Sequence, residues 1–310
     1  MAGEVKPLAT AAPESGARCD RKCRKQQYFR QFEVVERRVV SNGRELYNPP
    51  PGMSNLGSFI LAIDTASRSG SIAAARDGRL VAVWGVDTGA RQSSVLWEDI
   101  EIMLSRLEAS IDDVSAIAVA RGPGAFTGLR IGLAAAAGMA RASGAALFGV
   151  TTLELTARSS GAGENVWAVL NAYRNEVYAQ RMRVDSSGEV TALAEPVVGP
   201  PASVFESVGG VPARIVGDGA VAYRAHLDAV ASSCGVAISS SALAEAPAAA
   251  TWNVVPAGLC LAADLAELML LRIARGAIPG PVAPCYLRDS EAEVNRKAGR
   301  IIGAGAPRGV

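Results

Sequence analysis

The residues of this sequence best suited to chemistry are the glycines and the threonine of segment 121–132, which reads RGPGAFTGLRIG. The segment follows a short apolar run and precedes a stretch of small residues with helical spacing. Glycine allows positive φ angles and a close approach of the backbone, and the N-terminus of a helix carries partial positive charge. The segment is therefore a candidate anion site. A tight turn that needs glycine is the alternative.

A second candidate is the pair Asp64-Thr65, which directly follows the apolar run 59–63. It could contact a nucleotide phosphate, although a phosphate cradle needs exposed backbone N–H groups. We favour the alternative in which Asp64 caps and hydrogen-bonds its own loop. The candidate nucleotide contacts are Asp64, Thr65, Gly122, Gly124, Thr127 and Gly128, of which Thr127 is also a candidate helix cap.

Metal and hydrolytic chemistry lack their usual residues. The chain has one histidine, His226, for which a surface or packed position on a helix is predicted. Its five cysteines are odd in number and mostly far apart, which indicates reduced thiols, and Cys19 and Cys23 lack zinc-knuckle spacing. The sequence contains neither HExxH nor GxSxG. We predict no metal site, no intrinsic cofactor and no catalytic residue, with a metal-dependent glycoprotease-like peptidase as a remaining alternative.

Hydrophobic patterns place the candidate residues in an α/β domain. Segments 59–63, 71–76 and 80–86 predict three antiparallel strands, with a hairpin turn at Asp77-Gly78. The elements that should follow are a helix capped by Ser94, a strand, a second helix and a strand, at residues 94–109, 114–120, 129–142 and 147–150. A Rossmann domain opens with β-α-β, so this β-β-β-α-β-α-β order excludes it. The order is that of actin-like, Hsp70-like and sugar-kinase-like ATPase domains.

The second half of the chain fits a degenerate copy of the same domain. A hairpin at 166–171 and 176–183, a strand at 215–216 and a long helix at 255–275 with Pro256 in its first turn are predicted. The predicted domains are a disordered or mis-started basic extension, an N-terminal lobe, a C-terminal lobe and a flexible tail, at residues 1–52, 53–155, 156–294 and 295–310.

Composition indicates a soluble cytoplasmic protein. The chain is 49% apolar and 20% charged, and no apolar run approaches the ~18 residues that a membrane-spanning helix needs. Its first ten residues lack the pattern of a secretory signal. The basic residues concentrate in 1–52, so the body has a small net negative charge. A body of this charge has little affinity for an RNA backbone, so we expect any RNA contact to be made through a partner.

Several segments resemble the signature of the TsaB/YeaZ family, and their order and spacing agree across residues 59–288. They are AIDTA at 62–66, the glycine-rich segment 121–132, NAYRNEVY at 171–178, VGDG at 216–219 and PCYLR at 284–288. The departures are Asn171 where Asp is usual, Asn175 where Gly is usual, and Ser93 where a His-Ser pair is common. The resemblance implies an ASKHA (actin-like ATPase/RNase H-like) fold of two lobes, each with a mixed β-sheet flanked by helices.

The resemblance also implies a function. It predicts a non-catalytic platform in the complex that places threonylcarbamoyl on the tRNA adenosine next to the anticodon. The partners would be TsaD, a catalytic paralogue whose His-x-x-x-His metal pair this chain lacks, and the ATPase TsaE. ATP or ADP at the partner interface and a homodimer of the free protein stay open. In ATPases of this superfold a glycine stands at the position of Ala66, which argues against the alternative of a stand-alone ATPase or kinase.

The implied partner surface lies on the two helices of the first lobe. The residues assigned to it are Val95, Leu96, Ile100, Met103, Leu133, Ala136, Ala137 and Ala140. Small residues recur at intervals of four in Gly128, Gly132, Ala136 and Ala140. Such a stripe allows the close approach of a partner helix or, equally, of the chain's own sheet.

Overall fold

The computed structural model describes residues 58–67, 70–86, 92–240, 251–258 and 260–288, together with short strand segments between residues 31 and 45. Side chains of the first helix are described from residue 95 onward. The predictions for most of 1–52, for the side chains of Ser93 and Ser94, and for the tail 295–310 therefore lie outside the described residues. No described helix has the length and hydropathy needed to cross a membrane.

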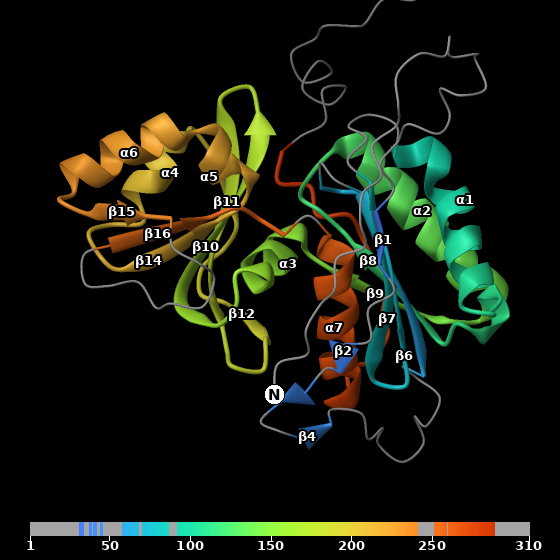
Figure 1. Ribbon diagram of the computed structural model, residues 1–310. Coiled ribbons are helices and arrows are strands. Elements are labelled where there is room, and N and C mark those ends of the chain that lie inside the picture. Colours follow the sequence, from blue (N-terminus) through green and yellow to red (C-terminus); the bar gives the residue numbers. More distant parts are fainter. Residues whose placement is uncertain are drawn as a thin grey trace, which may run out of the picture.

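The first lobe is built on a mixed sheet with the order β1-β7-β6-β5-β8-β9 (Figure 1). Its main strands are β5 (Phe59–Asp64), β6 (Gly70–Arg76), β7 (Arg79–Val86), β8 (Ala116–Ala120) and β9 (Ala146–Val150). The short strands near the start are β1 (Gln31–Glu33) and β2 (Arg37–Arg38), which pair with β7, and β3 (Val40–Ser41) with β4 (Arg44–Glu45). Asp77 and Gly78 both have positive φ, as a two-residue hairpin turn requires, so the predicted hairpin is confirmed.

Helices cover both faces of this sheet. On the outer face lie α1 (Gln92–Arg106) and α2 (Phe126–Ser143), and on the inner face lies α7 (Leu261–Ala274) (Figure 1). The short 3₁₀ turn η3 (Ile111–Asp113) packs through Ile111 against the core under α1 and α2. Alternate residues of β5 serve the two layers: Phe59, Leu61 and Ile63 pack with α1 and α2, whereas Ile60 and Ala62 pack with α7. The wholly apolar run of β5 is thus explained by burial on both faces.

The second lobe repeats this design with the strand order β12-β11-β10-β14-β16-β15. Its strands are β10 (Gly163–Tyr173), β11 (Glu176–Val184), β12 (Val190–Ala192), β13 (Val197–Gly199), β14 (Ala213–Val216), β15 (Ala237–Ser239) and β16 (Thr251–Val255). Its helices are α4 (Pro201–Glu206), α5 (Asp218–Ala222) and α6 (Arg224–Ser233) on one face and α3 (Thr152–Ser159) on the other. Two lobes with mixed sheets and flanking helices confirm the predicted fold class.

The lobes exchange one helix each. α3 follows β9 of the first sheet, yet Leu153 and Ala157 pack against β10 of the second sheet. α7 follows β16 of the second sheet and packs against the first, where it also meets Leu155 of α3. The predicted boundary between residues 155 and 156 falls inside α3.

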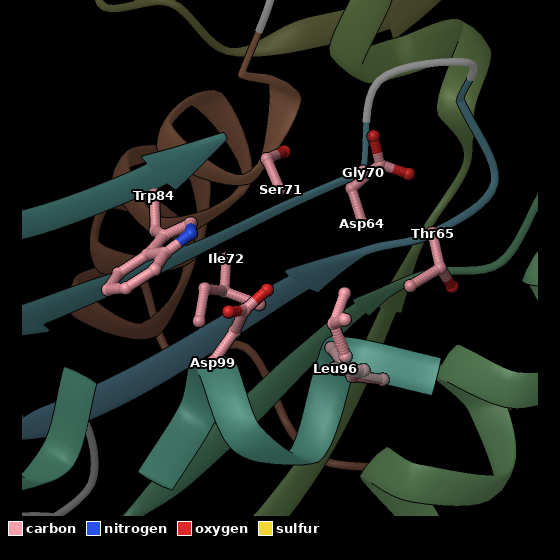
Figure 2. A pocket seen from close by; sticks show the side chains of 9 residues that line it. Asp64, Thr65, Gly70, Ser71, Ile72, Trp84, Leu96 and Asp99 are labelled. Carbon is pink, nitrogen blue, oxygen red and sulfur yellow. The ribbon is translucent and has the colours of Figure 1, made fainter. Parts of the chain in front are cut away.

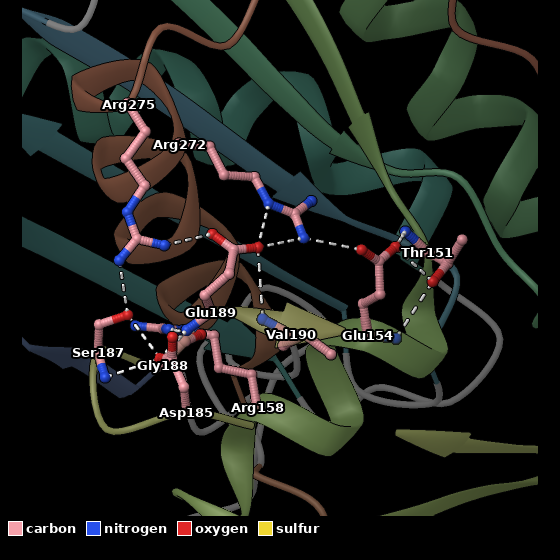
Figure 3. Close-up of polar contacts among 10 residues, drawn as sticks. All are labelled: Thr151, Glu154, Arg158, Asp185, Ser187, Gly188, Glu189, Val190, Arg272 and Arg275. Carbon is pink, nitrogen blue, oxygen red and sulfur yellow. Dashed lines mark hydrogen bonds and ion pairs between the residues drawn. The ribbon is translucent and has the colours of Figure 1, made fainter. Parts of the chain in front are cut away.

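Ion pairs reinforce this exchange (Figure 3). The Arg272 guanidinium on α7 lies 2.9 Å from a carboxylate oxygen of Glu154 and 2.8 Å from one of Glu189, both in the second lobe. Arg158 of α3 reaches back to Glu267 of α7 at 3.2 Å. These side chains are largely buried, so the network connects the two lobes more firmly than pairs in open solvent would.

Three predicted helix bounds are wrong. α1 begins at Gln92, so Ser94 is inside the helix and not its N-cap. α2 begins at Phe126 after an Ala125 N-cap without a side-chain bond, so Thr127 does not cap either. The predicted helix at 255–275 begins only at Leu261. Val255 instead ends β16, whose β-branched and aromatic residues suit a strand buried beside β14.

Candidate functional site

The glycine-rich turn is the point where three distant segments meet. A side chain at Gly124 would collide with the Ala66 carbonyl after β5, and Ala125 donates its N–H to that carbonyl oxygen at 2.9 Å. Gly122 has a φ of +92°, and a Cβ there would lie 3.0 Å from the carbonyl oxygen of Cys285. The glycines are therefore required by chain packing.

The small-residue stripe of α2 packs in the same way. A side chain at Gly132 would collide with Oγ1 of Thr65, and that hydroxyl donates to the carbonyl oxygen of Gly128 at 2.7 Å. Ala136 and Ala140 are buried against the sheet. The stripe therefore serves the approach of α2 to its own sheet, which is one of the two alternatives that the sequence left open.

Asp64 is buried and bonded within its own loop. Its carboxylate accepts the N–H groups of Ala66 and Ser67 at 2.9 and 3.2 Å and the hydroxyl of Ser67. Burial raises the pKa of Asp64 above its ordinary value, and these hydrogen bonds oppose the rise. The adjacent cavity, which Thr65 and Asp99 also line (Figure 2), measures about 20 Å³ and has room for a single water. This geometry favours the local role of Asp64, and a nucleotide contact stays a prediction.

A larger cleft of about 410 Å³ opens between the two lobes. The loop after β5 and the glycine-rich turn line it from the first lobe, and the end of β10, α5 and the linker 256–258 line it from the second. Asp218 accepts the backbone N–H of Asn171 at 3.0 Å, and the Asn171 side chain accepts the N–H of Tyr173 at 2.8 Å. Sequence reasoning assigned these residues no role, although they lie in two segments with a family resemblance.

The outer face of α1 and α2 differs from the predicted partner surface. Most of the assigned residues belong to the chain's own core, namely Leu96, Ile100, Met103, Ala136 and Ala140. Met103 is fully buried. Because these side chains pack on the sheet, they do not face a partner in this conformation. Of the other three, Ala137 is exposed and Val95 and Leu133 are partly buried.

Apart from Ala137, the residues that face outward were missed. Trp97 on α1 is 55% exposed, and Ala134 and Gly138 on α2 are exposed together with Ala137. The signal was present in the helical period, because Trp97 lies next to Leu96 and so points away from the face that Leu96, Ile100 and Met103 share.

Known proteins that match this chain in sequence and in structure identify its family and support its fold. The family described as "TsaD: tRNA N6-adenosine threonylcarbamoyltransferase" matches residues 90–295, which is more than half of the chain. The tRNA threonylcarbamoyladenosine biosynthesis protein TsaB of Escherichia coli K12 is 34% identical over 148 residues, 45% of this chain and 63% of that protein. The Haemophilus influenzae TsaB is 34% identical over 131 residues, 41% of this chain and 53% of that protein. The solved structure of YeaZ from Pseudomonas aeruginosa superposes with a TM-score of 0.59 at 26% identity, covering 74% of this chain and 100% of that one. The chain belongs to the TsaB/YeaZ family.

The alignments with both curated TsaB proteins span less than two thirds of those proteins' own length. The full coverage of the YeaZ structure supports the two-lobed ASKHA fold. The segments that suggested the TsaB/YeaZ family from sequence alone lie at the glycine-rich turn before α2, at the cleft between the lobes and in the C-terminal segment 284–288.

The C-terminal family segment is held against both lobes. Arg130 of α2 stacks 3.8 Å from the Phe126 ring centroid and donates from Nε to the hydroxyl of Tyr286 at 3.0 Å. Two residues further on, Arg288 pairs with Glu176 of the second lobe at 2.8 Å. No local pattern links residues so far apart in the sequence, so reasoning from periodicity could not find these contacts.

Metal ligands do not gather among the described residues of this TsaB/YeaZ chain, where no three His, Cys, Asp or Glu side chains form a group suited to an ion. The predicted lack of a metal site remains a prediction, because other residues lie outside the description. His226 is exposed on α6, and its ring lies edge-on to that of Tyr223 with 5.9 Å between the ring centroids, in keeping with an ordinary surface histidine. Cys19 and Cys23 lie outside the described residues.

Proposed function

We propose that this chain is a non-catalytic subunit in the synthesis of threonylcarbamoyladenosine in tRNA, and that it holds a TsaD-type enzyme in an active arrangement. Family membership supports the pathway, because the curated relatives carry the name of that biosynthesis. The observation that carries the platform role is the outward-facing Trp97 on a pair of long helices. No described side chain is assigned a catalytic task.

The docking surface of the proposal is the outer face of α1 and α2. Ala134, Ala137 and Gly138 are small and exposed, so a partner helix can approach α2 closely. Trp97 supplies a large apolar side chain of the kind that anchors protein interfaces. The buried residues Leu96 and Met103 support this face from below by fixing α1 on the sheet.

The other parts of the proposal follow from this surface. TsaE would join the pair as a further partner, tRNA would be bound through the complex, and any ATP or ADP would lie at the partner interface. A second copy of the chain would occupy the same face when no partner is present. The proposed location is the cytoplasm.

Reconstitution of tRNA modification with and without this chain tests the function. We expect modification to require the chain and the chain alone to be inactive. Modification at full rate without it would reject the platform role.

A Trp97→Asp variant tests the surface. An unpaired charge at the centre of an apolar contact should weaken binding to the TsaD-type partner by more than about tenfold. Val211→Asp is the control, since Val211 is also exposed but lies in the second lobe. Equal affinity of Trp97→Asp and the unmodified chain would reject this face as the interface.

A further inference from the structure

The outer face of α2 carries an exposed arginine near each end. Arg130 and Arg141 are about three helical turns apart and therefore lie on the same side of the helix, with the small exposed residues Ala134 and Ala137 between them. This is the side on which the proposed function places a partner. The two arginines differ in what holds their side chains.

Two aromatic rings hold the Arg130 side chain in place. Its guanidinium lies 3.8 Å from the centroid of the Phe126 ring, and its Nε donates to the hydroxyl of Tyr286 at 3.0 Å. The rings themselves are 40% exposed for Phe126 and 45% exposed for Tyr286. Because rings so exposed gain only part of the free energy of burial, their main effect at this place is to orient the guanidinium.

The outer donors of Arg130 remain available. Its two terminal amino groups make no hydrogen bond or ion pair with any described residue. Together they form the planar fork that binds a carboxylate through two parallel hydrogen bonds. A side chain that is already ordered also loses less conformational entropy on binding than a mobile one. Arg130 is therefore suited to an anionic group that the described part of the chain does not supply.

The position of Arg130 along α2 supports the same conclusion. It lies near the start of the helix, where the N-cap residue Ala125 makes no side-chain hydrogen bond. The helix dipole opposes a cation at this end and attracts an anion, whereas it favours Arg141 in the last turn. Helix stability therefore explains the presence of Arg141 but not that of Arg130.

We propose that Arg130 is a preformed anchor for a carboxylate side chain of the TsaD-type partner, and that it sets the position of a partner helix along α2. This inference rests on the proposed function and names the chemistry that the partner brings to the surface. The apolar contact of Trp97 is not directional. A bidentate ion pair at one end of the small-residue stripe is directional, and it fixes where along α2 the partner helix lies.

A protein carboxylate fits this surface better than an RNA phosphate does. An RNA backbone is bound by several cations in a row, whereas Arg130 and Arg141 are separated by about 16 Å of helix. The neighbouring helix α1 exposes Glu98 and Glu101, which repel a chain of phosphates. A single carboxylate on a partner helix needs only the one fork.

Binding of the purified TsaD-type partner to the full chain, measured by calorimetry without nucleotide, tests the anchor. We expect Arg130→Met to weaken binding by about tenfold or more, because it removes the fork and keeps a similar apolar stem. Arg130→Lys should recover only part of this loss, since an ammonium keeps the charge without the fork. Arg141→Met is the matched control on the same side of the helix and should weaken binding by less than about twofold.

Tyr286→Phe tests how the fork is positioned. It removes only the hydroxyl that accepts from Nε of Arg130, so we expect binding to weaken by about threefold. In the Arg130→Met background the same change should have no further effect, since its role acts through Arg130. Losses that add in the double variant would contradict this positioning role.

Replacing the exposed carboxylates of the partner by amides, one at a time, identifies the other half of the ion pair. One replacement should weaken binding to the unmodified chain and leave binding to Arg130→Met unchanged. The anchor is overturned by equal losses in Arg130→Met and Arg141→Met, by the lack of any coupled partner carboxylate, or by a loss of tRNA binding in place of partner binding. Full affinity of Arg130→Met beside weakened Trp97→Asp would reject the anchor alone. If the unmodified chain did not bind the partner, the proposed function would fail with it.

Discussion

The two lobes have the same sheet but different outer helical layers. In each, a central strand, β5 or β10, has an antiparallel neighbour on one side and a parallel neighbour on the other. The first sheet is covered by α1 and α2, of 15 and 18 residues, whereas the second is covered by α4, α5 and α6, of 6, 5 and 10 residues. Covering such a sheet therefore does not require long helices.

The extra length of α1 and α2 has a consequence at the surface. Their inner residues fill the core of the first lobe, and their outer residues include Trp97 and the small residues Ala134 and Gly138. Both helical layers therefore fill a core, and the layer of the first lobe also exposes Trp97 and the small residues Ala134 and Gly138. Substitutions on the two faces of these helices should separate the two roles.

The largest expected effect comes from the inner face of α2. Gly132→Val should destabilise the chain by about 3 kcal/mol or more, because the new side chain collides with Thr65. Gly138→Val in the same helix meets nothing within 4 Å, so it should change stability by less than about 0.5 kcal/mol. Urea unfolding measures both. If the two substitutions destabilised the chain equally, the inner face of α2 at Gly132 would not be more tightly packed than the outer face at Gly138.

The second largest loss of stability is expected when the ion-pair network between the lobes is broken. Arg272→Met should cost about 2 kcal/mol, since it leaves Glu154 and Glu189 without their shared, largely buried partner. Arg224→Met removes only the exposed pair with Asp228 and should cost less than about 0.5 kcal/mol. Thermal unfolding compares them, and an equal loss in both would contradict a structural role for the network.

The same network predicts a dependence on pH. Burial opposes the ionisation of Glu154, but the charge of Arg272 and the hydrogen bonds from Thr151 outweigh it and lower its pKa below the ordinary 4.5. A lowered folded-state pKa gives stability that is complete above pH 4.5 and is lost as the pH falls through the lower value. Glu154→Gln should therefore cost about 1 kcal/mol at pH 7, and the cost should shrink in acid. A pH-independent difference would contradict this.

The smallest effect on stability is expected on the outer face. Trp97→Ala should shift the free energy of unfolding by less than about 0.5 kcal/mol, because the side chain is mostly exposed. Partner affinity should fall in the same variant. A large loss of stability would mean that Trp97 is part of the fold and not of a docking surface.

Much of the fold could be predicted from local pattern. The apolar run of β5, the Asp77-Gly78 turn and the order of the elements depend on side-chain period and turn chemistry, which act between near neighbours. The predicted start of the last helix at Val255 was wrong because local pattern was the only guide there. Over a short segment an apolar run suits a strand and a buried helix equally, and pairing with β14 decided in favour of the strand.

Residue patterns alone were enough to predict the family, the two-lobed fold and the apolar face of each long helix. They could not decide whether Met103 and Ala136 meet the chain's own sheet or a partner, because both need the same small or apolar residues. Only the tertiary structure placed Thr65 against Gly132, Arg130 against Tyr286, and Asp218 in a cleft. The physical reason is that these contacts join segments distant in the chain, and their geometry is set by how helices and sheets pack.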